Sequence, residues 1–191
     1  MYRIAGIANP SAASATAAAH DLGNVRAFSS VKELVDSPEV DLIAITVKVP
    51  HHAELVRLAL GAGKHVLCEW PLAEAEDLAA LAACSGLVAA VGLQAVFAPA
   101  IDGLAEIMES GVLGSILSST LVGYGMTWGR EIEQRNAYLL DATNGATTLT
   151  LAIGHALSAV EAALGRITAV SGQISSRHSL CNGQLTDLER L

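Results

Sequence analysis

Three apolar runs, each followed by a helical segment, most constrain what this chain can fold into. The runs are Asp41–Val47 (DLIAITV), His65–Trp70 (HVLCEW) and Leu87–Leu93, and they are typical of strands buried on both faces of a sheet. Helical segments of ~10 residues follow them, beginning at Pro50, Glu74 and Ala100. Strands that alternate with helices predict βαβ units, a parallel sheet and therefore an α/β fold.

The first forty residues continue this pattern. Met1–Ala8 and Val25–Phe28 are predicted strands. Ser11 is placed to cap a helix over Ala12–His20, and Ser30 with Glu33 has the spacing of a capping box at the start of a second, short helix.

The pattern of apolar and polar residues changes after Gly114. Ile116–Trp128 interleaves polar and apolar residues, as in a half-exposed strand of an antiparallel sheet, and Ile167–Ser175 resembles a further strand. Between them, Ala146–Leu164 is expected to form one long apolar helix. We therefore predict two domains, an α/β domain over 1–114 and part of an α+β domain over 115–191.

Composition excludes several classes of protein. A net charge of −8 and only 4% aromatic residues oppose direct nucleic-acid binding, which needs clustered Lys and Arg and stacking side chains. No uninterrupted apolar run reaches the ~18 residues of a membrane span, so we expect no membrane association. Three widely spaced cysteines, Cys68, Cys84 and Cys181, predict neither a disulfide framework nor a zinc site, which favours a cytoplasmic location.

Several motifs together resemble one family. They are His52–Glu54 (HAE), Ala62–Val66 (AGKHV), Glu69–Pro71 (EWP), Val91–Gln94 with Phe97 and Pro99, Glu109–Gly114, and Asn144–Gly165. This pattern resembles the glucose–fructose oxidoreductase / inositol dehydrogenase (Gfo/Idh/MocA) family over most of the chain. The resemblance implies a Rossmann fold, a nicotinamide dinucleotide as cofactor, and hydride transfer to or from a sugar or polyol.

The glycine-rich turn of that family is missing. A GxGxxG turn after the first strand holds the pyrophosphate, and the chain contains none. The spacing from Arg3 to Asp41 fits the family's second strand, so the chain is expected to be truncated at its start, and again at Leu191. In the order 3-2-1-4-5-6 the missing strand is central, so strands two and four should be unpaired along their facing edges. The alternative is that Met1–Asn9 serves as the first strand, with an atypical turn.

Two further departures concern catalysis. The family's catalytic Lys follows the Glu of the Glu-x-Pro turn, where this chain has Trp70, and an indole N–H has no titrating proton in the useful range. Leu151 stands where the family often has an Asp, four residues before His155. Trp70 and Asn144–Thr147 resemble most the branch that contains the galactose-pathway repressor.

The resemblance places candidate site residues. His155 is the catalytic candidate, and a metal site is not expected, because adjacent His51 and His52 cannot face one ion from a single turn. Asn9 is neutral, so the choice between NAD and NADP stays open. The Trp70–Pro71 bond is expected to be cis. The candidate cofactor contacts are Asn9, Ser11, Val47, Lys48, Val49, Pro50, His52, Glu69, Trp70, Pro71 and Gln94.

The resulting prediction is an NAD(P)-linked oxidoreductase that acts on a sugar or polyol and forms homo-oligomers. The alternative is a non-catalytic regulator that responds to the dinucleotide and binds a protein partner. A third possibility is a shortened product without activity.

Overall fold

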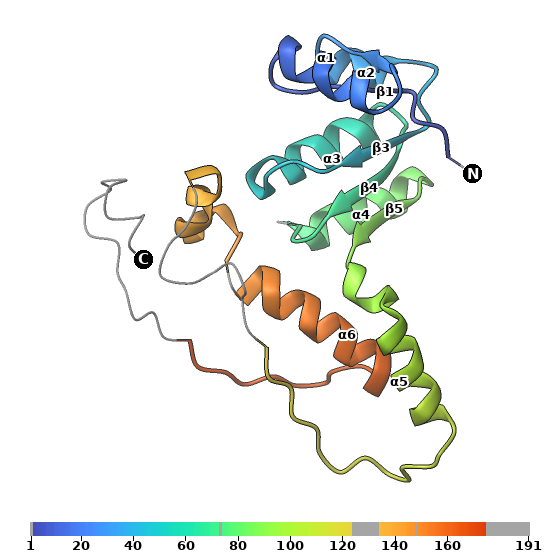
Figure 1. Ribbon diagram of the computed structural model, residues 1–191, viewed down its shortest axis with the longest axis vertical. Helices are drawn as coiled ribbons and strands as arrows, with labels where there is room; N and C mark the ends of the chain where they lie inside the picture. The colour runs from blue at the N-terminus through green and yellow to red at the C-terminus, as the bar shows by residue number, and fades with distance from the viewer. Residues whose placement is uncertain (1, 73, 124–133, 148, 175–191) are drawn as a thin grey trace. The chain divides into compact units, whose positions relative to one another are not determined.

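The computed structural model describes residues 2–72, 74–123, 134–147 and 149–174 (Figure 1). Internal contacts divide the chain into two units, Met1–Gly92 and Leu93–Leu191. Each unit is described by itself below.

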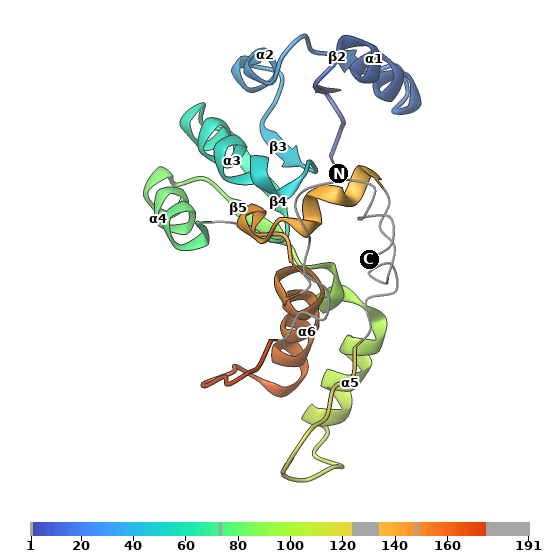
Figure 2. The same cartoon turned by 90° about the vertical axis from the view of Figure 1, so that its left-hand side faces the viewer.

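The first unit alternates strands and helices as the sequence predicts (Figures 1 and 2). Short strands and helices come first, and longer ones follow. The elements are β1 (Gly6–Ile7), α1 (Ala12–Asp21), β2 (Arg26–Ala27), α2 (Val31–Asp36), β3 (Leu42–Ile45), the 3-10 turn η1 (Val49–His51), α3 (His52–Gly61), β4 (His65–Glu69), α4 (Ala75–Ser85) and β5 (Ala89–Gly92).

All strand pairs in this unit are parallel, but they form two separate sheets. One sheet contains β1 and β2, and the other has the order β3-β4-β5. Ile43 lies opposite Val66, which lies opposite Ala89. In the described part of the chain, β1 and β3 each have one strand neighbour. This confirms the α/β fold with parallel strands, and among the described residues the second edges of β1 and β3 are unpaired, as expected.

Strands β3 and β4 are buried on one face, whereas Ala89, Ala90 and Val91 of β5 are exposed. Side chains on that face join Phe28 and Val35 in the core of the unit: Ile43, Ile45, Val66 and Cys68. The opposite face carries Ala44, Leu67 and Ala90, which lie side by side on neighbouring strands and are all exposed. The prediction of strands buried on both faces was therefore wrong. Apolar content alone does not show whether another element covers the second face.

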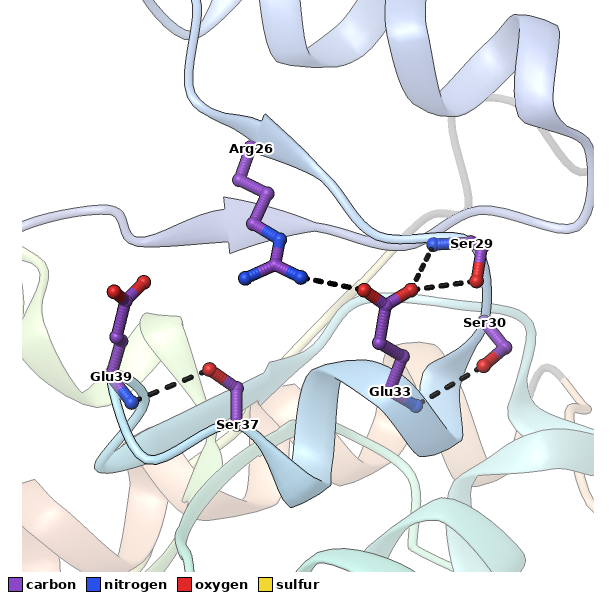
Figure 3. Close-up of polar contacts among 6 residues, drawn as sticks. All are labelled: Arg26, Ser29, Ser30, Glu33, Ser37 and Glu39. Carbon is purple, nitrogen blue, oxygen red and sulfur yellow. Dashed lines mark hydrogen bonds and ion pairs between the residues drawn. The ribbon is translucent and has the colours of Figure 1, made fainter.

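A polar cluster fixes α2 against β2 (Figure 3). Ser30 caps the helix, because its side chain accepts a hydrogen bond of 3.1 Å from the Glu33 amide. The Glu33 carboxylate accepts from the amide and hydroxyl of Ser29, at 2.8 and 2.6 Å, and pairs with Arg26 at 2.6 Å. Arg26 also lies 4.3 Å from the centre of the Phe28 ring. Hydrogen bonds from Ser29, and then the contact with Arg26, hold the pKa of Glu33 below its ordinary value.

The second unit contains η2 (Gln94–Phe97), α5 (Pro99–Glu109), the 3-10 turns η3 (Gln134–Leu140) and η4 (Ala142–Asn144), a π-helical turn at Leu149–Ile153, and α6 (Gly154–Leu164). Helix α5 packs against α6, which is why contacts group it with this unit although it precedes Gly114. The domain boundary near Gly114 stays a prediction.

Three sequence expectations differ in this unit. The helix predicted over Ala146–Leu164 is α-helical only in α6 and begins as a π turn. Ile116–Gly123 and Ile167–Ile174 contain no strand, and the remaining parts of the two predicted strands, 124–128 and Ser175, lie outside the described residues.

One segment, Ala142–Leu164, is long and apolar enough to cross a membrane by length and composition. This segment is not an uninterrupted apolar run, because it includes Asn144, His155 and Glu161. The expectation from the sequence concerned uninterrupted runs only. It is divided into η4, the π turn and α6, and only 6% of its most apolar stretch is buried. It is weak evidence for a membrane span.

Gly6→Ala should destabilise the first unit. A Cβ atom at this position would lie 2.4 Å from the Phe28 ring and 2.5 Å from the Arg26 carbonyl oxygen, so β1 and β2 would have to move apart. We expect a loss of about 1–3 kcal/mol in the free energy of unfolding, measured with urea. Gly61→Ala is the matched control, because its Cβ meets nothing within 4 Å and an alanine favours the helix. Equal stability of the two variants would contradict the close packing of Gly6.

Glu33→Gln should change how stability depends on pH. Because folding lowers the pKa of Glu33, this carboxylate stabilises the native state above its unfolded pKa of about 4.5, and that contribution is lost as the pH falls through the lower folded value. The variant should be less stable than the wild type at neutral pH, and the two curves should converge in acid. Asp36→Asn, which removes an exposed partner of Lys32, should leave the fall in stability at acid pH unchanged. Urea unfolding at several pH values measures both curves.

Candidate functional site

Two loops meet at the carboxyl ends of neighbouring parallel strands. Val47–Pro50 follows β3, and Trp70–Pro71 follows β4, whose last residue is Glu69. The register pairs Ile45 with Cys68, so both chains leave the sheet at the same edge. Ligands bind at such edges in open α/β sheets. The sheet thus brings together most of the predicted contact residues.

The side chains of these loops differ in exposure. Val47, Lys48, Pro50 and Glu69 are exposed, and Trp70 is half-buried. Val49 and Pro71 are buried and anchor the two loops to the interior of the unit. The Trp70–Pro71 bond is cis, as the family resemblance implies. A ligand above this edge would therefore meet Lys48 and Glu69 as its charged contacts.

His52 lies beneath the two loops. Its side chain is 1% exposed, Nε2 lies 2.8 Å from the Val47 carbonyl oxygen, and Nδ1 lies 2.9 Å from the Pro71 carbonyl oxygen. A ring held in this way does not present a free nitrogen to a ligand. Its contacts instead link the loop after β3 to the turn after β4. A buried polar atom left without its partner costs about 1–3 kcal/mol, so both contacts matter for stability.

A second link between α3 and the chain after β4 lies at the surface. Arg57 pairs with Glu74 at 2.5 Å, and both side chains are about half exposed. Glu74 has φ +58°, a left-handed conformation that is uncommon for a residue with a side chain. The pair has no signal in the sequence, because its partners are 17 residues apart and neither belongs to a recognised motif.

The AGKHV motif has a structural role. Lys64 Nζ donates to the Ser37 carbonyl oxygen at 2.8 Å, which ties the start of β4 to the end of α2. His65 Nδ1 accepts from the Val88 amide at 2.9 Å, which ties β4 to the approach to β5. Gly63 ends α3 with φ +74°. These contacts hold the sheet at the amino end of β4, away from the loops at its carboxyl end.

Cys68 is the buried thiol of this region. Desolvation, with a smaller effect of the Glu69 charge, raises its pKa to about 11. The thiol is therefore neutral at physiological pH and acts as a small apolar core residue. The described residues contain no group of three or more His, Cys, Asp or Glu side chains arranged to hold a metal ion.

Asn9 and Ser11 lie after β1, in the other sheet. Asn9 Nδ2 donates to the Ser14 carbonyl oxygen at 3.2 Å, and Ser11 Oγ accepts from the Ser14 amide at 3.2 Å. Ser11 thus caps α1, as predicted, whereas Asn9 donates to a carbonyl oxygen of its first turn. Their contact with a cofactor stays a prediction.

Gln94 and His155 belong to the second unit. Gln94 is exposed at the start of η2, and His155 is half-buried near the start of α6. The His155 carbonyl oxygen accepts from Ser158 Oγ at 2.8 Å, and Leu151 lies in the preceding π turn. The catalytic role of His155 stays a prediction.

Comparisons with known proteins match both halves of the chain. Residues 1–93 match the model of the oxidoreductase family with an NAD-binding Rossmann fold (GFO_IDH_MocA), and residues 99–182 match that of the Gal80p C-terminal domain. The dehydrogenase aclE of Aspergillus oryzae is 39% identical over 181 residues, which are 91% of this chain and 49% of aclE.

Solved structures give the same result. A super-repressor variant of Gal80p from Saccharomyces cerevisiae is 26% identical with a TM-score of 0.75, over 83% of this chain and 44% of the other. An NAD-binding oxidoreductase from Klebsiella pneumoniae is 27% identical with a TM-score of 0.67, over 83% and 43%. The chain spans about half the length of aclE and less of the two solved structures. The first half of the chain is thus similar to the Gfo/Idh/MocA oxidoreductase family, and its second half is similar to the C-terminal domain of Gal80p.

Proposed function

We propose that this chain provides the nicotinamide-side half of a dinucleotide site in an NAD(P)-linked oxidoreductase that acts on a sugar or polyol. The observation that carries the proposal is the meeting of the Val47–Pro50 loop and the Glu69–Pro71 turn at the carboxyl ends of β3 and β4. A Rossmann sheet holds its dinucleotide at this edge. The family match supports a nicotinamide nucleotide as the ligand.

The residues fit one part of such a ligand and not another. Exposed Glu69 can accept hydrogen bonds from ribose hydroxyls, and exposed Lys48 can lie near a phosphate. The sequence contains no GxGxxG turn to surround the pyrophosphate. Asn9 brings no carboxylate that would accept from a 2′-hydroxyl, so it favours neither NAD nor NADP. We therefore expect the chain alone to bind the dinucleotide weakly.

In the oxidoreductase, the bound nicotinamide would supply hydride chemistry, and the chain would supply position and proton handling. His155 is our candidate for proton transfer to or from the substrate hydroxyl. Trp70 cannot perform this role, because its indole N–H does not titrate near neutral pH.

A specific observation favours the second candidate, a non-catalytic regulator that responds to a dinucleotide and binds a protein. Trp70 and Leu151 replace two residues that the family's catalytic members use, and the second half of the chain matches the Gal80p C-terminal domain. In this case the nucleotide would act as a signal. Free thiols at Cys68 and Cys84 in the described chain are compatible with the cytoplasmic location that both candidates share.

Saturation-transfer NMR with millimolar NADH or NADPH tests the proposal. We expect saturation of the ligand's ribose and nicotinamide protons, together with affinity too weak for micromolar calorimetry. Glu69→Gln should reduce the transfer, because it removes the proposed ribose acceptor. Glu76→Gln, another exposed acid in the first turn of α4, is the matched control.

Two results would contradict this prediction. Absence of saturation transfer, or an equal effect of the two variants, would refute the proposed site. Micromolar affinity would contradict the argument from the glycine turn and favour Met1–Asn9 as the family's first strand. Reduction of NAD⁺ or NADP⁺ with a sugar or polyol would then identify an oxidoreductase, whereas binding without turnover would favour the regulator.

We also propose that the chain forms homo-oligomers through its second unit. The described segment Ile116–Gly123 is not a strand, so the predicted pairing of strand edges lacks support there. Its apolar side chains are nevertheless exposed, with Leu117 at 95% and Val122 at 66%. Burying such side chains between copies is favourable at contact, where a charge of −8 is partly screened by salt.

Val122→Lys should therefore shift the chain toward the monomer. Light scattering at micromolar concentration should show species larger than the 19.6 kDa chain in the wild type and a larger monomer fraction in the variant. Ser119→Lys places the same charge at another exposed position of this segment and should have a smaller effect. A wild-type protein that is entirely monomeric would refute the proposal.

A further inference from the structure

The second edge of β3 presents main-chain groups that no strand pairs in the described part of the chain. Alternate residues of a parallel strand direct their N–H and C=O groups to opposite edges. The Asp41 carbonyl oxygen, just before β3, accepts from the His65 amide of β4 at 2.9 Å, so the groups of Ile43 also point to β4. The groups of Leu42 and Ala44 consequently point to the free edge.

Strand β1 has a free edge of the same kind. The Ile7 carbonyl oxygen accepts from the Phe28 amide at 2.8 Å, on the side of β2. The groups of Gly6 and Ala8 therefore point to the opposite edge, which has no strand neighbour among the residues described. Both free edges thus offer N–H donors and carbonyl acceptors to a further strand.

The helices show that these two edges face each other. Val35 of α2, Val56 of α3 and Leu78 of α4 belong to one core, whereas no described residue of α1, with its buried Ala15 and Ala19, belongs to it. Figure 2 shows the same division, with α2, α3 and α4 on one side of the strands and α1 on the other. Crossovers between parallel strands are right-handed, so α2 carries the chain from β2 in the direction of β4 and β5, whereas α1 carries it the opposite way. The order is therefore β2-β1, an interruption, and β3-β4-β5.

The residues along the two edges select an apolar strand. Residues 5–8 and Leu42–Ile45 include no charged side chain and no proline. Native proteins commonly protect free edges with Lys, Pro or inward-pointing charges, and these edges carry none of them. Ile43 and Ile45 face the shared core, so a strand beside them would place alternate side chains in that core. Charged side chains at those positions would be costly.

The charge and sequence of the chain favour a different polypeptide as the source of this strand. Only five residues precede β1, too few for the crossover of about a dozen residues that a preceding parallel strand requires. The exposed segment 116–123 of a second copy has Ser118, Ser119 and Thr120 at its centre, which suits an apolar site poorly. A net charge of −8 also disfavours a second copy and favours a segment flanked by Lys or Arg.

We propose that the free edges of β1 and β3 form an acceptor site for one extended apolar segment, flanked by basic residues, of a separate polypeptide. The segment adds as a parallel strand and joins the two sheets. Main-chain hydrogen bonds on both of its edges supply affinity, and the core-facing positions supply the preference for apolar side chains. The site uses neither loop of the candidate nucleotide site, so it is independent of the proposed function.

Hydrogen exchange of the full chain, followed by NMR, tests the site with the synthetic peptide KKVIVAVIKK. The peptide should slow exchange of the four amides that point to the free edges, those of Gly6, Ala8, Leu42 and Ala44. The peptide EEVIVAVIEE has the same apolar centre, but the negative chain repels it, so it should slow exchange less at the same concentration. Equal slowing by the two peptides would overturn the basic character of the partner.

Ala44→Pro removes the amide donor from the free edge of β3 and should abolish the effect of the peptide. The pairing with β4 uses the neighbours of Ala44, so it is preserved. Ala89→Pro is the matched control. The Val66 amide donates to the Val88 carbonyl oxygen at 2.9 Å, so the Ala89 amide points to the outer edge of β5, and this variant should respond like the wild type. If Ala44→Pro does not fold, the exchange pattern of the wild type decides.

Exchange at the four edge amides that is already slow without peptide would overturn the proposal. Slow exchange that disappears on dilution would identify a second copy as the donor, and slow exchange at every concentration would show that β1 and β3 pair with each other. Absence of slowing by the lysine-flanked peptide would also refute the site. Equal slowing at Val91, on the outer edge of β5, would show unspecific strand addition and refute it too.

Discussion

The pairing of β4 with strands on both of its edges is the interaction on which the first unit depends. It places β3 and β5 in parallel register, so that α3 and α4 cover the face carrying Ile43, Val66 and Cys68. It also aligns the ends of β3 and β4 and brings their loops together. Lys64 and His65 add polar ties at the start of the same strand. The candidate site depends on this register, because its residues come from two separate segments, Val47–Pro50 and Glu69–Pro71.

The interruption between β1 and β3 has the opposite effect. A parallel sheet is normally covered on both faces and continuous through its centre. In the described part of the chain, the two sheets share a core through Phe28 and Val35 but exchange no strand hydrogen bonds. Both the open edges and the exposed row of Ala44, Leu67 and Ala90 lie in this unit. The sequence also contains no GxGxxG turn, which in the family holds the pyrophosphate. We therefore expect weak nucleotide binding, although the fold resembles that of the family.

The sequence predicted local features well and long-range features less well. In the first unit the order of strands and helices, the Ser11 and Ser30 caps and the cis Trp70–Pro71 bond were correct, because each depends on neighbouring residues or a short motif. The strands predicted at Ile116–Trp128 and Ile167–Ser175 are not strands in their described parts. Burial of both sheet faces was wrong, because apolar content does not reveal whether a helix covers them. The helix predicted over Ala146–Leu164 was too long, because α6 begins only at Gly154 and follows a π turn, at the start of which Thr147 and Thr150 hydrogen-bond to each other. The Arg57–Glu74 pair depends on tertiary contact and had no sequence signal.

His52 illustrates why a candidate site needs both kinds of information. The HAE motif identifies the residue and suggests a cofactor contact, but burial and two carbonyl partners direct its ring away from any ligand. Direct contact then falls to exposed Lys48 and Glu69, in the two segments whose Val47 and Pro71 carbonyls the ring contacts. This division also bears on the two candidate functions. The family resemblance implies a catalytic lysine at the position of Trp70. Such a replacement would remove one proton carrier but leave the supporting contacts of the loops, so a nucleotide site could persist without catalysis.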